Sequence, residues 1–381
     1  MNTLKTAIWI SMSYLLIVGL IGLWLRGMSV FNLSGIYTFI IHAHSHTAFM
    51  GWLNNVIFIV IVRRMGIDTP WTTKVFWWYQ VACIGMLLSF PFQGYGPVSI
   101  AFSTLHVVVS VVFVVKVYGK LQDYHPMGKW IKAGMLFMLL SSLGPFALGP
   151  LSAMGYKTTV WYQLAIQHYL HFYYNGWFLM AMMGLVNGHL KVRNDRVIFW
   201  LMTFSMPLLL FTSVMFYINA WWVQLLSIAG SILFMTGVIM ILKVWSTRGQ
   251  TGLVWMTILI CLLGKAAFQL LANLPGVAEW VITQRHVVIG YLHLNFLGLL
   301  TPLAFYLLTK ELQIKLNRGF GAIIYVMGFI LTELLLFISF IGITGLHMAL
   351  FIASAIIVIG IVMFLISFIK LDLSHEHSTT N

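Results

Sequence analysis

Residues 36–62 read IYTFIIHAHSHTAFMGWLNNVIFIVIV and contain no Asp, Glu, Lys or Arg. An α-helix rises about 1.5 Å per residue, so this stretch would be about 40 Å long as a helix. The hydrocarbon core of a bilayer is about 30 Å thick. The stretch is therefore predicted to cross a membrane as one helix, although it carries three histidines.

Composition extends this prediction to the whole chain. Of the 381 residues, 61% are hydrophobic and only 8% are charged, with a mean hydropathy of +0.95. A soluble domain has roughly 25% charged residues. A soluble enzyme is excluded, and the sequence predicts an all-α, polytopic bundle of about twelve transmembrane helices. These spans are expected near residues 7–25, 36–62, 72–91, 97–118, 129–149, 158–187, 196–216, 221–244, 252–273, 283–308, 319–341 and 347–370.

The net charge of +13 indicates topology rather than nucleic-acid binding. Cytoplasmic loops of membrane proteins carry the excess of Lys and Arg. With both termini in the cytoplasm, only Arg26, Lys157 and Arg285 are predicted on the outer side of the membrane. A polar cytoplasmic tail is predicted at residues 371–381. The predicted cytoplasmic segments hold Lys5, Arg63, Arg64, Lys74, Lys116, Lys120, Lys129, Lys132, Lys191, Arg193, Arg196, Lys243, Arg248, Lys310, Lys315, Arg318 and Lys370.

A short motif recurs in the second, sixth and tenth predicted spans. Each copy is a histidine followed five residues later by a glycine, starting at His46, His171 and His293. Recurrence at equivalent positions indicates an internal repeat. The bundle would then form three units of four helices in a pseudo-threefold arrangement, near residues 1–120, 121–248 and 249–370.

Histidines gather in these three spans, in the predicted outer half of the membrane. Intramembrane ionisable residues are functional hypotheses by default, although any single histidine can simply bond to a neighbouring helix. His44 lies about 200° round the helix from His46, on a different face. Three pairs share a helix face: His42 with His46, His168 with His171, and His286 with His293.

Imidazole is a ligand for iron, copper and zinc, and a haem iron takes one histidine on each axial side. A glycine five residues after a ligand lets a flat macrocycle or a neighbouring helix approach the backbone. The residues thus predict a metal or haem site between spans 2, 6 and 10. The two cysteines, Cys83 and Cys261, form no metal or haem motif and are expected to be small core residues.

At these motifs the sequence resembles the catalytic subunit of the haem–copper oxidases, particularly the nitric oxide reductase and C-family branches. His46-Thr47 resembles the second-helix ligand of the low-spin haem, and His293-Leu-Asn-Phe-Leu-Gly298 resembles the ligand on its other side. His171-Phe-Tyr-Tyr-Asn-Gly176 resembles a ligand of the non-haem metal. The resemblance implies haem b, a second metal (copper or iron) and the inner (plasma) membrane of a prokaryote.

The sequence departs from this family at the oxygen-reducing centre. The family has a His-His pair in the seventh helix, whereas residues 196–216 contain no histidine. The position of its high-spin haem ligand is Tyr291 here. The low-spin pair His46 and His293 therefore carries over, and a different second site is left to the remaining histidines. These candidate metal ligands are His44, His171, His168, His286 and His42.

Three charged residues complete the candidate set. Lys265 lies near the middle of span 9, and Glu333 is a carboxylate inside span 11. A charge at the membrane centre costs about 3 kcal/mol on insertion scales, so each must be neutral, paired or in contact with water. Both are candidates for a proton path, with mutual pairing as the structural alternative. Arg285, beside His286, is a candidate partner for a haem propionate or an interfacial anchor.

Two functions from different classes remain open. The first is a haem-b redox protein that passes electrons from a cytochrome or quinol and binds or reduces nitric oxide or another small gaseous ligand. The second is a histidine-lined copper or zinc transporter or sensor, since transporters are also built from internal repeats. The threefold histidine–glycine motif favours haem.

Overall fold

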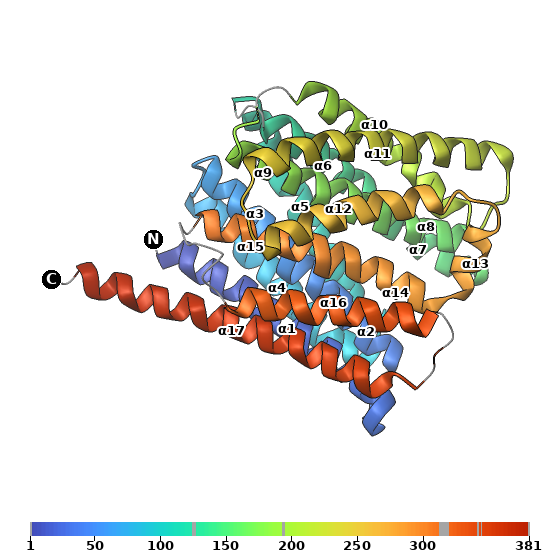
Figure 1. Ribbon diagram of the computed structural model, residues 1–381, viewed down its shortest axis with the longest axis horizontal. Helices are drawn as coiled ribbons and strands as arrows, with labels where there is room; N and C mark the ends of the chain where they lie inside the picture. Colours follow the sequence, from blue (N-terminus) through green and yellow to red (C-terminus); the bar gives the residue numbers. More distant parts are fainter. Residues whose placement is uncertain are drawn as a thin grey trace. The chain divides into compact units, whose positions relative to one another are not determined.

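A computed structural model of the chain describes residues 2–123, 127–192, 195–311, 320–340, 343 and 345–379. Within these ranges every regular element is a helix (Figure 1). The α-helices are α1 (Asn2–Phe31), α2 (Tyr37–His46), α3 (Asn54–Arg64), α4 (Pro70–Gln93), α5 (Pro97–Val117), α6 (Met127–Ser141), α7 (Leu143–Ala153), α8 (Val160–Leu170), α9 (Met180–His189), α10 (Arg196–Val214), α11 (Trp221–Arg248), α12 (Leu253–Leu271), α13 (Val277–Thr283), α14 (Arg285–His293), α15 (Thr301–Glu311), α16 (Phe320–Phe340) and α17 (His347–Thr379).

Five shorter helices have a different hydrogen-bond pattern. Two are 3₁₀-helices, η2 (Tyr118–Asp123) and η3 (Tyr156–Thr158). The other three are π-helices, in which the backbone bonds run five residues back: η1 (Thr47–Leu53), η4 (His171–Leu179) and η5 (Leu294–Leu300).

Eleven helical segments of the described residues are long and apolar enough to cross a membrane, and they match eleven of the twelve predicted spans. The twelfth predicted span, residues 158–187, corresponds to a continuous helical run from Val160 to His189. This run is not one of the eleven long apolar segments. Polar side chains such as Gln163, Gln167 and Asn175 make this run less apolar. The chain is thus an all-α, multi-pass membrane protein.

One compact unit contains Met1–Ser110, Gly252–Thr257 and Ala304–Asn381. In it α16 and α17 lie side by side, α17 also packs on α1, and α2 packs on α4 (Figure 1). The span at residues 36–62 forms the core of this unit, where Val56, Ile57 and other residues of α3 are fully buried. A helix that is apolar all round belongs in such an interior.

The second compact unit contains Val111–Thr251 and Ile258–Leu303. Here α10 pairs with α11, and α6 packs on η4 and α9. Several of its buried polar side chains are bonded to each other. The Asp195 carboxylate, which is fully buried, accepts from the Lys129 ammonium and, at 2.6 Å, from Trp130 Nε1. Trp245 Nε1 donates to Asn187 Oδ1 at 2.8 Å.

Several predictions about particular segments can be compared with the structure. Cys83 and Cys261 are both buried free thiols, as expected. Helix α17 continues past residue 370 to Thr379, so the backbone of the predicted tail is helical to that point. Residues 380–381, Arg193, Lys315 and Arg318 lie outside the described residues. The division into three units of four helices stays a prediction.

Large apolar side chains cover the outer faces of the spans. Phe92 is 84% exposed, Val115 is 72% exposed and Leu88 is 63% exposed. A soluble protein rarely exposes such faces. In a multi-pass membrane protein these side chains contact lipid acyl chains.

The pairing of α16 with α17 depends on small residues at their contact, and this generates a first prediction. A Cβ added at Gly360 would overlap the backbone nitrogen of Tyr325. Gly360→Ala is therefore expected to destabilise the protein by about 1–3 kcal/mol, because the helices must move apart. Gly119→Ala, with open space around its Cβ, should change stability by less than about 0.5 kcal/mol. Thermal unfolding of both variants in detergent measures the difference, and equal midpoints would contradict close packing at Gly360.

Candidate functional site

The three histidine–glycine motifs share a backbone feature. His46 is the last residue of α2 before η1, His171 is the first residue of η4, and His293 is the last residue of α14 before η5. Short π-helical segments inside α-helices occur frequently at functional sites. The repeat seen in the sequence therefore corresponds to one local structure that occurs three times.

Asparagine side chains bond to backbone carbonyls at two of the π-helices. Asn55 Nδ2 donates to the Gly51 carbonyl at 2.8 Å, next to η1. Asn295 Nδ2 donates to the Tyr291 carbonyl at 2.6 Å, next to η5. Because a bilayer offers no water to these groups, such side-chain bonds let the π-helices persist inside a span.

One ring nitrogen of His46 bonds to its own helix, and the other faces an aromatic side chain. Its Nδ1 lies 2.9 Å from the carbonyl of His42, which can only accept, so Nδ1 carries the hydrogen and Nε2 is the acceptor nitrogen. Nε2 faces Tyr95, whose hydroxyl donates a long hydrogen bond to it at 3.5 Å, and the centroid of the Phe90 ring lies 4.3 Å from that of the His46 ring. Histidines that bind metals are commonly held this way, through the other nitrogen and a carbonyl.

The neighbouring histidines of α2 divide between two faces. The His42 ring lies 4.5 Å from Tyr95, on the same side as His46. His44 Nδ1 instead lies 3.1 Å from the Val18 carbonyl, and its ring packs on Gly22 of α1. The predicted separation of His44 from His46 is thus confirmed.

His171 differs from His46 because both of its ring nitrogens make hydrogen bonds of ordinary length. Nε2 lies 2.7 Å from the Met206 carbonyl and Nδ1 lies 3.1 Å from Asn175 Nδ2. Nε2 must therefore donate and Nδ1 must accept. His168 Nε2 similarly lies 2.9 Å from the Leu140 carbonyl. For His171 to bind a metal, one of its two hydrogen bonds would have to break.

Lys265 lies at the centre of a buried polar network in the second unit. Only 1% of it is exposed, and its Nζ donates to Asn175 Oδ1 at 2.6 Å, Asn295 Oδ1 at 2.7 Å and the Tyr291 hydroxyl at 3.2 Å. The rings of Tyr291 and Tyr174 lie 5.3 and 5.4 Å from Nζ, within cation–π distance. Among the described residues no carboxylate lies within ion-pair distance of it.

This network links two of the π-helices and reaches both of their histidines. Asn175 belongs to η4, and its amide bonds to Lys265 through Oδ1 and to His171 through Nδ2. Asn295 belongs to η5, and Tyr291 lies two residues before His293. Lys265 thereby orients Asn175, whose Nδ2 then faces His171 Nδ1, and this agrees with the hydrogen on Nε2 that the Met206 carbonyl requires.

The remaining candidates lie in more varied places. Arg285 and His286 are exposed at the start of α14, whereas His293 is half-buried at its end. Glu333 is half-buried in α16, in the first unit, while Lys265 belongs to the second. In the part of the chain that the structure describes, no three His, Cys, Asp or Glu residues form a group that could hold a metal ion.

Sequence reasoning missed Tyr95, the residue that faces His46 Nε2. It lies between Gly94 and Gly96, after the end of α4, where no helical periodicity marks it. Because successive spans cross the membrane in opposite directions, their order could have predicted the position of Tyr95. The end of the third span and the start of the second face the same side of a membrane, so this aromatic turn had to lie near the beginning of α2.

The fold and these buried polar groups define a multi-pass, all-α membrane protein with an internal histidine, lysine and asparagine network. No protein-family model matches the chain, and no curated protein matches it significantly.

The Lys265 network generates a second prediction. Lys265→Met removes three donated hydrogen bonds and leaves the side-chain oxygens of Asn175 and Asn295 buried without their donor. Each buried acceptor left unsatisfied costs about 1–3 kcal/mol, so the variant should lose about 2–4 kcal/mol of stability. Unfolding in detergent measures this loss.

Lys243→Met is the matched control, because Lys243 is exposed near the end of α11. It should change stability by less than about 0.5 kcal/mol. If both lysine variants unfold at the same midpoint, the network does not hold the helices together.

Proposed function

We propose that the protein is a haem-b-binding redox protein of the membrane, related to the haem–copper oxidases and nitric oxide reductases. The axial ligands would be His46 and His293, the pair expected from the sequence. The observation that carries this proposal is the setting of His46, whose Nδ1 is held by a backbone carbonyl, so that the electron pair of Nε2 points toward the Tyr95 hydroxyl, 3.5 Å away. His293 occupies the equivalent position in its own motif, directly before a π-helix.

The role proposed for the bound haem is limited to electron transfer. Haem b supplies a one-electron couple when bound, and His46 and His293 would hold and orient it. The Tyr95 hydroxyl lies 3.5 Å from His46 Nε2 and would have to give up this contact when His46 holds the haem. Arg285 is exposed at the start of α14, where a carboxylate such as a propionate could pair with it.

Electron transfer is favoured over oxygen reduction because of the second candidate centre. His171 uses both ring nitrogens within the protein, and His168 is bonded to a carbonyl. His44 faces α1 rather than His46, so these residues do not supply a ready ligand set. Binding of a small gaseous ligand such as nitric oxide at His42, His168, His171 or His286 remains the secondary part of the proposal.

A metal transporter or sensor is supported less well. Copper and zinc sites commonly use three or four His, Cys or carboxylate ligands, and the described residues bring no three of these together. A haem needs only two axial histidines from the protein. The electron donor proposed is a cytochrome or quinol, and the location proposed is the inner membrane of a prokaryote with both termini in the cytoplasm.

The haem proposal predicts an optical spectrum. Protein purified in detergent from haem-sufficient cells should show a sharp low-spin b-type α-band in the reduced-minus-oxidised spectrum. A pyridine haemochrome assay gives the haem type and stoichiometry. His46→Ala and His293→Ala should each abolish the band, because a low-spin haem needs both axial ligands.

His347→Ala is the control, since His347 is exposed at the start of α17 and should leave the band unchanged. Absence of haem from the wild-type protein would refute the proposal. Retention of the band in both ligand variants would show that other residues bind the haem.

A proton path through Lys265 predicts a pH-dependent haem potential. The Lys265 network reaches Tyr291, two residues before His293, so a proton taken up there would stabilise the reduced haem. The midpoint potential should then fall as pH rises, by up to about 59 mV per pH unit for one proton per electron. Lys265→Met should flatten this slope, and redox titration at several pH values measures it.

Glu333→Gln tests the other candidate in the same way. A flattened slope in Glu333→Gln but not in Lys265→Met would assign the proton to Glu333. A wild-type potential that does not vary with pH would exclude both residues from redox-linked proton uptake.

A further inference from the structure

One side of helix α12 carries polar residues from the middle of its span to its end. Lys265 and Gln269 belong to α12, and Asn273 follows the end of this helix at Leu271. The three are spaced four residues apart, so they follow one another along one side of the helix. They are only 1%, 6% and 9% exposed, so this side faces other parts of the protein and not lipid.

Helix α11 supplies polar partners for this side of α12. Asn273 Nδ2 donates to Ser231 Oγ at 3.0 Å, and Ser231 Oγ donates to the backbone carbonyl of Gln269 at 3.1 Å. One turn earlier in α11, Ser227 Oγ lies 2.8 Å from Thr212 Oγ1 of α10. Both serines are fully buried. The polar sides of α11 and α12 therefore face each other inside the second unit.

These contacts extend to the membrane surface in one direction and to Lys265 in the other. Gln224 is exposed in the first turn of α11, and its Nε2 donates to the Asn273 carbonyl at 3.3 Å. The Gln269 side chain interacts with the Tyr291 hydroxyl, which accepts from Lys265 Nζ at 3.2 Å. Polar groups thus follow one another from the ends of two spans into the interior of the unit.

Two oxygens along this series accept no hydrogen bond from the described residues. They are Gln269 Oε1 and Asn273 Oδ1, and both are buried. Buried polar atoms in native proteins nearly always have a partner, and ordered water supplies it where the protein does not. These oxygens, one helical turn apart, are therefore positions at which water can bind.

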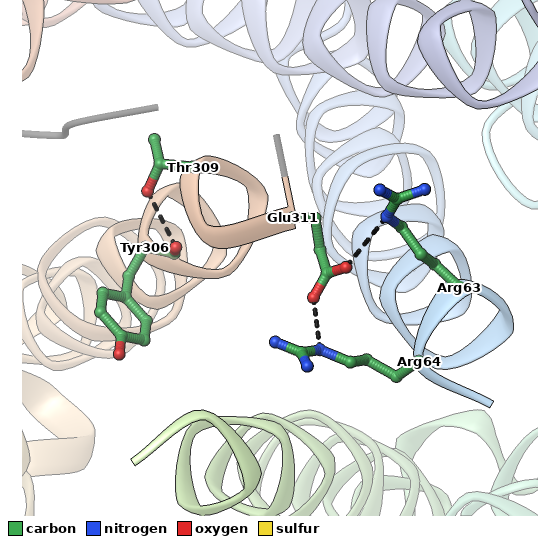
Figure 2. Close-up of polar contacts among 5 residues, drawn as sticks. All are labelled: Arg63, Arg64, Tyr306, Thr309 and Glu311. Atoms are coloured by element: carbon green, nitrogen blue, oxygen red, sulfur yellow. Dashed lines mark hydrogen bonds and ion pairs between the residues drawn. The ribbon is translucent and has the colours of Figure 1, made fainter. Parts of the chain in front are cut away.

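A buried charge is normally neutralised by opposite charges, as the first unit shows. The Glu311 side chain is 5% exposed, and its two oxygens lie 3.2 Å from Arg63 Nε and 2.6 Å from Arg64 Nε (Figure 2). The two guanidinium groups offset the charge of the carboxylate, which would otherwise be costly to bury.

Lys265 is buried more completely than Glu311 and has a different environment. The described acceptors of its ammonium are neutral oxygens. The titratable groups near it are Tyr291 of α14 and, from η4, Tyr174 and His171, and the ring of Phe234 faces it from α11. With no carboxylate to exchange a proton with, Lys265 can gain or lose one only if water reaches it.

We propose that the facing sides of α11 and α12 form a water path from the membrane surface to Lys265, lined by Gln224, Asn273, Ser231 and Gln269. Water bound at the two free oxygens carries protons between the surface and the lysine. The use of the path rests on the proton role proposed above for Lys265, but its existence does not depend on haem. Thiol accessibility reports on the path without haem, so a missing haem and a missing path give different results.

Single cysteines in the full chain, held in lipid nanodiscs, test the path. Ser231→Cys and Gln269→Cys place a thiol on it, whereas Ile232→Cys and Leu270→Cys place one on the next residue, which is 52% or 37% exposed toward lipid. The probe is Ag⁺, which is no larger than a water molecule. Thiolates bind metal and form poorly in apolar surroundings, so Ag⁺ should react at least about tenfold faster with the two buried thiols than with the two exposed ones.

Thiols that Ag⁺ has not reached are counted with a polyethylene glycol maleimide after the protein is unfolded in SDS. Wild-type protein sets the baseline, because its cysteines, Cys83 and Cys261, are buried. Ser231→Cys only replaces oxygen by sulfur, so it tests the path even if Gln269→Cys unfolds. Gln224→Cys, at the exposed end, shows that the reagent is active.

A double variant tests the direction of entry. Asn273→Leu removes a water-binding oxygen between the surface and Ser231, so it should slow the reaction of the Ser231→Cys thiol. An unchanged rate would show that water arrives from elsewhere and would overturn the proposal. Equal rates at the buried and the lipid-facing thiols, or reaction at Gln224→Cys alone, would overturn it as well.

Discussion

The hydrocarbon of a bilayer offers the backbone no hydrogen-bond partner, and the structure of this chain follows from that constraint. Every described span is a helix, because a helix satisfies its own N–H and C=O groups. A departure from α-helical geometry inside a span is tolerated more easily where a side chain bonds to the carbonyls that it affects. Asn55 does this for Gly51, and Asn295 does it for Tyr291. At η1 and η5, the π-helix therefore comes with an asparagine that bonds to a nearby backbone carbonyl.

The same constraint explains why His46 and His171 are not equivalent. Each ring must bond to something, and the bonds come from different sources. His46 bonds to its own helix through Nδ1 and keeps Nε2 at an aromatic surface formed by Phe90 and Tyr95. His171 is bonded on one side to Met206 of another helix and on the other to Asn175, which Lys265 orients. The first arrangement suits a ligand of an external group, whereas the second suits the joining of helices.

Charged groups follow two patterns that depend on depth. Lys265, within a span, is surrounded by neutral oxygens and aromatic rings. Arg63, Arg64 and Glu311, at the ends of spans, form ion pairs and keep part of their surface exposed. Burial of a charge is costly unless it is bonded on all sides, and the ends of spans lie nearest to water. Function is accordingly proposed inside the bundle, for proton and electron transfer.

The sequence by itself determined the class of the protein and the positions of its spans, because hydropathy and length are properties of each segment alone. It also predicted the separation of His44 from His46, which follows from the pitch of a helix, and the recurrence of one motif in spans 2, 6 and 10. Only the tertiary structure decided what each polar group bonds to. Arg64 and Glu311 are 247 residues apart, and Lys265 is 90 residues from Asn175. Neither pairing has a periodic signal, since contacts between distant helices depend on how the helices pack.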